Sequence, residues 1–134
     1  MKKTIMLFAG TTEGRRICEF LAVKKCITHV YVTTEYGKEL LPGQNNVHIH
    51  VGKMDEKQMS DEIKAIHPDI VIDATHPYAT QVTHNIKEAC DSRHIFYVRV
   101  LREENIEKAG NNADNIIYTE TMKDAVRLLN EDRY

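Results

Sequence analysis

The strongest constraint on the fold of this 134-residue chain is a regular alternation of two kinds of apolar segment. Short runs rich in β-branched residues, typical of strands, recur at residues 4–9, 29–34, 46–51, 69–74, 95–100 and 115–119. Between them, apolar residues recur at helical spacing within residues 14–21, 59–66, 82–90 and 122–129. Alternation of this kind predicts a parallel sheet with helices on both faces.

Right-handed crossovers restrict such a sheet to a few topologies. We predict one α/β domain over residues 1–134, a Rossmann-like doubly wound parallel sheet of strand order 3-2-1-4-5 with a possible sixth strand beyond the fifth. A flavodoxin-like order of 2-1-3-4-5 is the alternative. Residues 35–41 allow only a short helix before Pro42 and Gly43, and residues 103–114 are predicted to be loop. The chain ends directly after a predicted helix, so we expect it to be part of a longer protein.

Composition excludes several partners. The net charge of −2, with Lys and Arg dispersed, predicts no binding to nucleic acid or acidic lipid. The apolar runs are too short for a transmembrane helix, and the opening "MKKTIMLFAG" is too short for a signal peptide. Cys18, Cys26 and Cys90 show no paired spacing, which indicates reduced thiols. We therefore predict a cytoplasmic protein.

The first predicted strand ends in a glycine loop, "AGTTEGRR". In the predicted strand order, ligands bind in the crevice between the ends of strands 1 and 4. Gly10 permits a sharp turn, and Gly14 lets the helix approach the strand closely. The N–H groups of the helix start suit a phosphate, and the hydroxyls of Thr11 and Thr12 add hydrogen bonds. The spacing is G-x-x-x-G without a Walker lysine, so a tight turn with a Thr cap is the alternative.

The tip of the second strand carries Thr33, Thr34 and Glu35. In dinucleotide-binding folds this position contacts the adenosine ribose. An acidic residue there favours the free 2′-hydroxyl of NAD, so Glu35 favours NADH. Threonine hydroxyls can still bind a 2′-phosphate, which leaves NADPH open.

The fourth strand ends in "DATHPYAT", a polar stretch at the other wall of the predicted crevice. Because proline suits the first turn of a helix, Thr75 or His76 is predicted to be the helix cap before Pro77. Asp73 is expected to orient this loop through backbone N–H groups. His76 and Tyr78 are the candidate catalytic residues, and a structural role for His76 is the alternative.

Four arginines and two histidines remain as candidates. Arg15 and Arg16 follow the glycine loop, where one could reach a phosphate while the other faces water. Arg99 and Arg102 flank the end of the fifth strand, where they could bind substrate carboxylates or be solvated. His48 and His50 alternate with apolar residues and share one strand face, but no third ligand is suitably spaced, so we predict no metal site.

Common enzyme motifs are absent from the sequence. There is no G-x-S-x-G nucleophile elbow, and no cysteine lies at a strand-to-helix turn. Tyr78 is followed four residues later by Val82, so the Tyr-Lys pair of short-chain dehydrogenases is missing.

Taken together, "GTTEGR", "TEYG", and "DATHPYA" followed by "NIKEAC" resemble the amino-terminal half of the precorrin-6A reductase family (CobK/CbiJ). The resemblance implies an NADPH- or NADH-dependent reductase of corrin (cobalamin) biosynthesis, which transfers hydride to precorrin-6A or cobalt-precorrin-6A. NADPH goes with the metal-free substrate and NADH with the cobalt form. It also implies a second α/β domain, with the cofactor between the halves and a tetrapyrrole as substrate.

By this resemblance, three cofactor loops fall at residues 10–14, at residues 33–37 and at residues 75–78. The cofactor-binding candidates on them are Gly10, Thr11, Thr12, Glu13, Gly14, Thr33, Thr34, Glu35, Thr75, His76 and Pro77. The chain departs from the family pattern at Ala9, where a second glycine is common, and at Glu103, where proline is expected. The second half of the family pattern is not in this sequence.

Two other functions share the predicted fold. A non-catalytic nucleotide-sensing Rossmann regulatory domain normally has G-x-G-x-x-G and an acid after strand 2, of which only the acid, Glu35, is present. A flavodoxin-like FMN domain would use the Thr-rich first loop for phosphate, but paired aromatics that sandwich a flavin are not evident.

Overall fold

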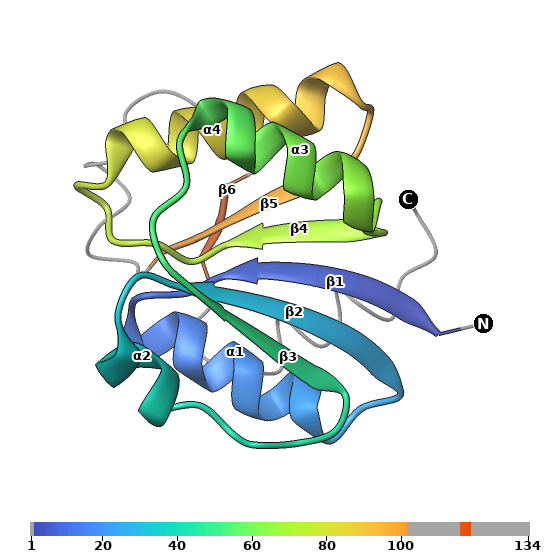
Figure 1. Ribbon diagram of the computed structural model, residues 1–134, viewed down its shortest axis with the longest axis vertical. Helices are drawn as coiled ribbons and strands as arrows, with labels where there is room; N and C mark the ends of the chain where they lie inside the picture. Colours follow the sequence, from blue (N-terminus) through green and yellow to red (C-terminus); the bar gives the residue numbers. More distant parts are fainter. Residues whose placement is uncertain (1, 102–115, 119–134) are drawn as a thin grey trace.

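Six parallel strands form one sheet in the order β3-β2-β1-β4-β5-β6 within residues 2–101 and 116–118, which the computed structural model describes (Figure 1). The strands are β1 (Lys3–Phe8), β2 (Cys26–Val32), β3 (Val47–Val51), β4 (Ile70–Asp73), β5 (Phe96–Leu101) and β6 (Ile116–Tyr118). The helices are α1 (Thr12–Ala22), α2 (Glu35–Glu39), α3 (Glu56–Ile66) and α4 (Thr80–Ser92). The predicted order is confirmed, including the sixth strand, and the flavodoxin-like order is wrong because β1 pairs with β2 and β4.

Helices cover both faces of the sheet, with α1 and α2 on one face and α3 and α4 on the other (Figure 1). Neighbouring strand residues supply opposite cores, because side chains alternate across a strand. Leu7 packs in the core beneath α1, whereas Met6 packs in the core beneath α3 and α4. Every residue of β4 is buried, as expected for a central parallel strand.

The predicted helices at residues 14–21, 59–66 and 82–90 are confirmed as α1, α3 and α4, each beginning two or three residues earlier than predicted. Strand β2 begins at Cys26, three residues before the predicted start. Thr28 hid this start, because it is a polar residue that is nevertheless 0% exposed and pairs with Ile5 of β1. The predicted loop at 103–114 and helix at 122–129 lie outside the described residues.

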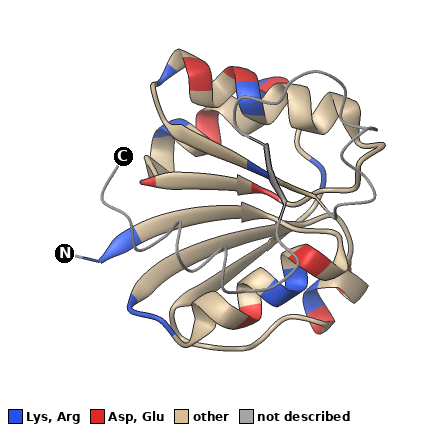
Figure 2. Ribbon diagram, turned by 180° about the vertical axis from the view of Figure 1, so that it is seen from behind, with Lys and Arg blue, Asp and Glu red and all other residues tan. Residues whose placement is uncertain are grey.

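Charge is mixed over the described surface. Basic and acidic residues are interspersed on the helices of both layers in Figure 2, in keeping with the net charge of −2. None of the helices in the described ranges is long and apolar enough to span a membrane.

A stack of three imidazoles, His29, His48 and His50, lies on the α3 side of β2 and β3. The His29 ring centroid is 5.0 Å from that of His48 and 5.3 Å from that of His50, and His29 Nδ1 lies 3.0 Å from His50 Nε2. Tyr31 continues the stack at 4.6 Å from His50 and donates its hydroxyl to Glu62. His48 and His50 thus share one face as predicted. Within residues 2–101, no group of three or more His, Cys, Asp or Glu side chains could hold a metal ion.

Protonation of His29 opposes folding. Burial, followed by the proximity of His50 and His48, lowers the pKa of His29 below its ordinary value of 6.5, and Glu62 opposes this only in part. A group with a depressed basic pKa binds fewer protons in the folded chain than in the unfolded chain. Its contribution to stability is therefore full above pH 6.5 and is lost as the pH falls below that value.

We expect the free energy of unfolding to fall between pH 7 and pH 5, and to fall less in a His29→Phe variant. Phenylalanine keeps the ring stacking but cannot take up a proton. Urea unfolding followed by circular dichroism at each pH measures the difference. His84→Phe, which removes a histidine at an exposed helical position outside the stack, is the control and should change the pH dependence less than His29→Phe does. If the free energy of unfolding falls equally with pH in the wild type and in His29→Phe, His29 is not the source of the pH dependence.

Candidate functional site

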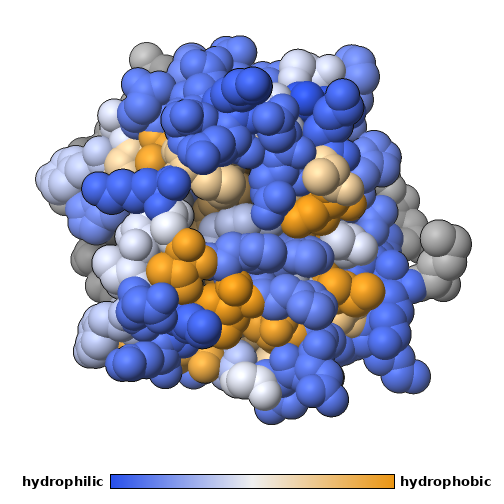
Figure 3. All heavy atoms as spheres, in the orientation of Figure 1, coloured by the Kyte–Doolittle hydropathy of each residue, from blue (hydrophilic) through white to orange (hydrophobic). Residues whose placement is uncertain are grey.

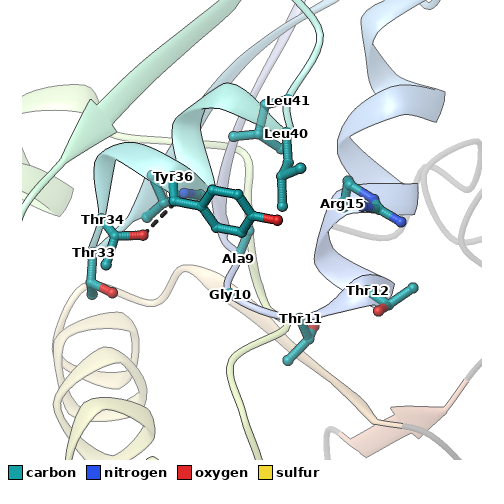
Figure 4. A pocket seen from close by; sticks show the side chains of 12 residues that line it. Ala9, Gly10, Thr11, Thr12, Arg15, Thr33, Thr34, Tyr36, Leu40 and Leu41 are labelled. Atoms are coloured by element: carbon teal, nitrogen blue, oxygen red, sulfur yellow. Dashed lines mark hydrogen bonds between the residues drawn. The ribbon is translucent and has the colours of Figure 1, made fainter.

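An open pocket of about 380 Å³ lies at the carboxyl edge of the sheet, between the loop after β1 and the β2–α2 segment (Figure 4). Residues 9–12 and Arg15 line one side, and residues 32–34, 36, 37, 40 and 41 line the other. Carboxyl ends of parallel strands are where ligands bind in open α/β sheets, and the volume lies within the range of small-molecule sites. Of the predicted site residues, the pocket therefore brings together Gly10, Thr11, Thr12, Thr33 and Thr34.

Two glycines shape the first loop for different reasons. Gly10 has φ of +148°, a backbone conformation that other residues rarely adopt, although a Cβ there would meet nothing within 4 Å. A Cβ on Gly14 would lie 2.9 Å from both Cα and Cβ of Ala9. The conformation requires glycine at position 10, and the predicted close approach of helix and strand requires it at position 14.

The Thr11 hydroxyl joins the first loop to the end of β4. Its oxygen accepts a hydrogen bond from the Gly14 N–H at 3.1 Å, which caps α1, and its proton is donated to the Ala74 carbonyl at 2.7 Å. In the described part of the chain, the backbone N–H groups of Thr11 and Thr12 have no hydrogen-bond partner. Free N–H groups at the start of an 11-residue helix favour an anion.

The second loop contributes hydroxyls and a ring. Thr34 caps α2 by accepting from the Gly37 N–H at 3.0 Å, and Thr33 is exposed beside it. Tyr36, 69% exposed, lies on the α2 side of the pocket in Figure 4, and Arg15 lies on the α1 side. Figure 3 shows apolar side chains among polar ones in the region of α2, where Leu40 is 41% exposed.

Two oppositely charged candidates differ in position. Arg15 lines the pocket, and its side chain has no ion pair or hydrogen bond with any described residue. Glu35 lies in the first turn of α2, is exposed, and does not line the pocket. The charge that the pocket offers a ligand is therefore positive.

The third loop, residues 74–79 between β4 and α4, is held by hydrogen bonds to a buried carboxylate, that of Asp73. Asp73 is 0% exposed, and its Oδ1 accepts from the Thr75 N–H at 3.1 Å and from the Thr75 hydroxyl at 2.7 Å. Its Oδ2 accepts from the hydroxyls of Thr83 and Tyr97, each at 2.8 Å. Burial and the neighbouring Asp73 raise the pKa of Tyr97, so its phenol stays a donor. The predicted role of Asp73 in orienting the loop through a backbone N–H is confirmed.

Arg99 is buried beneath the same loop. It is 5% exposed, and its Nη1 donates to the carbonyl of Thr75 at 2.8 Å and to that of Asp73 at 3.1 Å. Its Nη2 donates to the His76 carbonyl at 3.4 Å. These contacts favour a role in holding the loop over direct contact with a substrate. Arg102 lies outside the described residues.

The predicted cap of α4 is wrong. The helix begins at Thr80, and Ala79 precedes it without any side-chain cap, because the Thr75 hydroxyl is bonded to Asp73 instead. Residues 76–79 form a turn closed by the Ala79 N–H and the His76 carbonyl at 2.9 Å. The Tyr78 N–H donates to His76 Nδ1 at 3.1 Å.

Thr75, His76 and Pro77 do not line the pocket, nor do Glu13 and Gly14. His76 and Tyr78 are exposed at the carboxyl edge with ring centroids 5.1 Å apart. The third loop is joined to the pocket through the bond from Thr11 to Ala74.

The three cysteines are buried and free, away from this pocket. Burial raises the pKa of Cys18 and of Cys90 to about 12, so both are neutral thiols rather than nucleophiles near pH 7.

Tyr36 and Gly37 belong to the second loop that the family resemblance pointed to, and both line the pocket. Sequence reasoning missed the pocket residues Leu40 and Leu41, which follow that loop. It also missed Thr83 and Tyr97 as partners of Asp73, since nothing local marks them.

Comparison with known proteins places these loops in one family. The family described as precorrin-6x reductase CbiJ/CobK matches residues 4–133. The cobalt-precorrin-6A reductase of Methanocaldococcus jannaschii is 34% identical over 126 residues, which cover 92% of this chain and 48% of the relative. The enzyme of the same name from Methanothermobacter thermautotrophicus is 32% identical over 104 residues, or 77% of this chain and 34% of the relative. The chain thus spans less than half the length of these relatives.

Solved structures show the same fold. A CobK precorrin-6A reductase matches 75% of this chain and 39% of its own length with a TM-score of 0.64 and 24% identity. The Bordetella bronchiseptica enzyme WbmH, solved in complex with NAD+, matches 77% of this chain and 40% of its own length with a TM-score of 0.62 and 18% identity.

We expect Gly14→Ala to destabilise the domain. Forcing a methyl group against the Ala9 backbone costs about 1–3 kcal/mol, of which improved helix propensity offsets at most about 1 kcal/mol. Urea unfolding measures the change. Gly43→Ala, at a position with nothing within 4 Å, is the matched control. It should change stability by no more than about 0.5 kcal/mol. Equal changes in the free energy of unfolding for the two substitutions would show that close packing against Ala9 is not why position 14 is glycine.

Proposed function

Because the chain belongs to the precorrin-6x reductase (CbiJ/CobK) family, we propose that residues 1–134 form the amino-terminal, cofactor-binding domain of a corrin-pathway reductase. Its reaction is hydride transfer from a reduced nicotinamide cofactor to precorrin-6A or cobalt-precorrin-6A, and the names of the curated relatives favour the cobalt form. A second α/β domain belongs to the proposal, in keeping with the share of these relatives that the chain spans. So does a cytoplasmic location, in keeping with three free, buried cysteines.

The observation that carries this proposal is the pocket between the first two loops. A dinucleotide needs a phosphate site at a helix start and a ribose site at the tip of the next strand. Thr11 and Thr12 supply unpaired N–H groups at the first position, and Thr33 supplies a hydroxyl at the second. Gly10 keeps the turn free of a side chain between them.

The chemistry of the site suits a reductase. A bound reduced nicotinamide supplies the hydride, so the protein needs no nucleophile. The residues of this chain then have to bind and orient the cofactor, which agrees with hydroxyls, backbone N–H groups and one arginine at the pocket. His76 and Tyr78 are exposed at the same edge, where they remain the proposed candidates for a proton step.

The alternatives are not favoured. The strand order excludes the flavodoxin-like arrangement on which the FMN reading depended. A regulatory domain shares the pocket, but the curated relatives carry the name of a reductase.

We further propose NADPH as the preferred cofactor. Arg15 faces the pocket without a partner among the described residues, whereas Glu35, which favoured NADH on sequence grounds, does not line it. A guanidinium binds a 2′-phosphate by charge-assisted hydrogen bonds, and a free ribose hydroxyl gains much less from it. The family resemblance links the cobalt substrate with NADH, so the two lines of argument differ and cofactor titration decides between them.

The first test is calorimetric titration of the chain with NADPH and with NADH. The wild type should bind at least one of them, and Gly10→Val should lose roughly tenfold or more in affinity. A β-branched residue at φ of +148° distorts the turn that presents the N–H groups, at a cost of about 1–3 kcal/mol in stability. Circular dichroism checks that the variant stays folded. A folded Gly10→Val with wild-type affinity, or a wild type that binds neither nucleotide, would refute the assignment.

The second test concerns the 2′-phosphate. Arg15→Leu should weaken NADPH binding by roughly 10- to 100-fold, as expected for a lost charge-assisted hydrogen bond, and leave NADH binding unchanged. Arg16→Leu is the matched control, because Arg16 is exposed on the same helix and does not line the pocket. A parallel loss of both nucleotides in Arg15→Leu would remove the argument for NADPH.

A further inference from the structure

We infer that Arg99 is a positioning residue, which fixes the main chain of residues 73–76 and thereby the Ala74 carbonyl to which the first loop is bonded through Thr11. Its importance for the cofactor rests on the proposed function. Its action on the loop rests on geometry alone. Arg99 itself is too deeply buried to touch a ligand, being 5% exposed.

The first argument is the direction of its hydrogen bonds. Arg99 donates to three main-chain carbonyls within four residues, those of Asp73, Thr75 and His76. A guanidinium presents five donors in a rigid fork, so bonds to several carbonyls fix their relative placement. Lysine, with a single point charge, cannot reproduce this geometry.

The second argument is that Asp73, the carboxylate partner of Arg99, has its hydrogen bonds satisfied by other residues. Asp73 already accepts four hydrogen bonds, two from Thr75 and one each from Thr83 and Tyr97, all between 2.7 and 3.1 Å. Its contact with Arg99 is longer, at 3.4 Å, whereas Arg99 reaches the Thr75 carbonyl at 2.8 Å. The shortest contact of Arg99 is therefore with the loop and not with the opposite charge.

The third argument is energetic. A buried ion pair contributes little net stability, since desolvation of both charges offsets their attraction. Apolar side chains in place of the ion pair would leave the carbonyls of Asp73, Thr75 and His76 without the donor that Arg99 supplies. The value of an arginine at this position thus lies in the geometry it imposes on the loop.

Among the described residues, the main chain of Thr75 and His76 has few other hydrogen bonds. Strand β4 ends at Asp73, and beyond it the Ala74 N–H donates to the Phe8 carbonyl at 2.8 Å. Helix α4 starts without a side-chain cap. Between these points, the main chain of Thr75 and His76 is held by Asp73, by the turn at Ala79 and by Arg99.

The consequence reaches the pocket through one bond. The Thr11 hydroxyl donates to the Ala74 carbonyl, in the middle of the segment that Arg99 holds. Movement of this segment withdraws the acceptor of Thr11, whose oxygen also caps α1 at the phosphate-binding turn. Loss of Arg99 should therefore weaken nucleotide binding without any direct contact being removed.

The test compares Arg99→Met with Tyr97→Phe in the full chain. Both remove a donor to Asp73, but only the first releases the loop carbonyls. Amide hydrogen exchange is followed by NMR at Tyr78 and Ala79, whose N–H groups are bonded to His76, and at Gly52, whose N–H is bonded to Val32. We expect Arg99→Met to accelerate exchange at Tyr78 and Ala79 at least tenfold and to leave Gly52 unchanged. Tyr97→Phe should leave all three amides unchanged.

Two further variants keep the outcome decisive. Asp73→Asn combined with Arg99→Met avoids an unpaired buried carboxylate if the single variant fails to fold, and it should show the loop-specific acceleration relative to Asp73→Asn alone, because Asp73 itself bonds the Thr75 N–H. Arg99→Lys restores the charge but not the fork, and should recover less than half of the lost protection. Full recovery by lysine would show that charge, not geometry, is what the site requires.

Nucleotide titration of the same variants separates this inference from the proposed function. Arg99→Met should bind the preferred nucleotide at least tenfold more weakly than Tyr97→Phe does. If the wild type binds neither nucleotide, the proposed function fails while the exchange data still decide the role of Arg99. Unchanged exchange at Tyr78 and Ala79 in Arg99→Met, or equal acceleration at Gly52, would overturn the inference.

Discussion

The candidate site depends on the two hydrogen bonds of one hydroxyl, that of Thr11. By accepting from Gly14 it starts helix α1, and by donating to Ala74 it ties that start to the end of β4. Strands β1 and β4 are neighbours at the point where the strand order reverses, so their connections leave in opposite directions. In this chain the Thr11 hydroxyl bridges these two strand ends directly, 2.7 Å from the Ala74 carbonyl. The sequence predicted a crevice between the ends of β1 and β4, whereas the pocket lies on the other side of the first loop, towards β2 and α2.

The strand order followed from the sequence because each buried strand is marked by its own residues. Ile5 to Phe8 and Ile70 to Asp73 need no distant partner to be recognised as central strands. The start of α4 did not follow, because Thr75 had two possible uses. It could cap a helix or bond to Asp73, and the choice depended on Thr83, Tyr97 and Arg99, which are remote in sequence.

The charged side chains near the pocket were also beyond what the sequence alone could place. Arg15 and Arg16 are adjacent in the sequence, and only the phase of α1 decides which of them lines the pocket. Glu35 is next to two threonines of the pocket, yet the cap formed by Thr34 turns the chain so that Glu35 does not line it. Local patterns located the loops correctly, whereas the direction of each side chain depended on how those loops turn.

The contact between Gly14 and Ala9 also bears on how this chain can evolve. The obstacle at Gly14 includes the Cα of Ala9, a main-chain atom that no substitution can remove. A neighbouring change such as Ala9→Gly would take away one methyl group and leave that obstacle in place. A substitution at position 9 therefore cannot make room for a side chain at position 14. A change at Ala74, whose Cβ would lie 3.4 Å away, would relieve only the weaker of the two contacts.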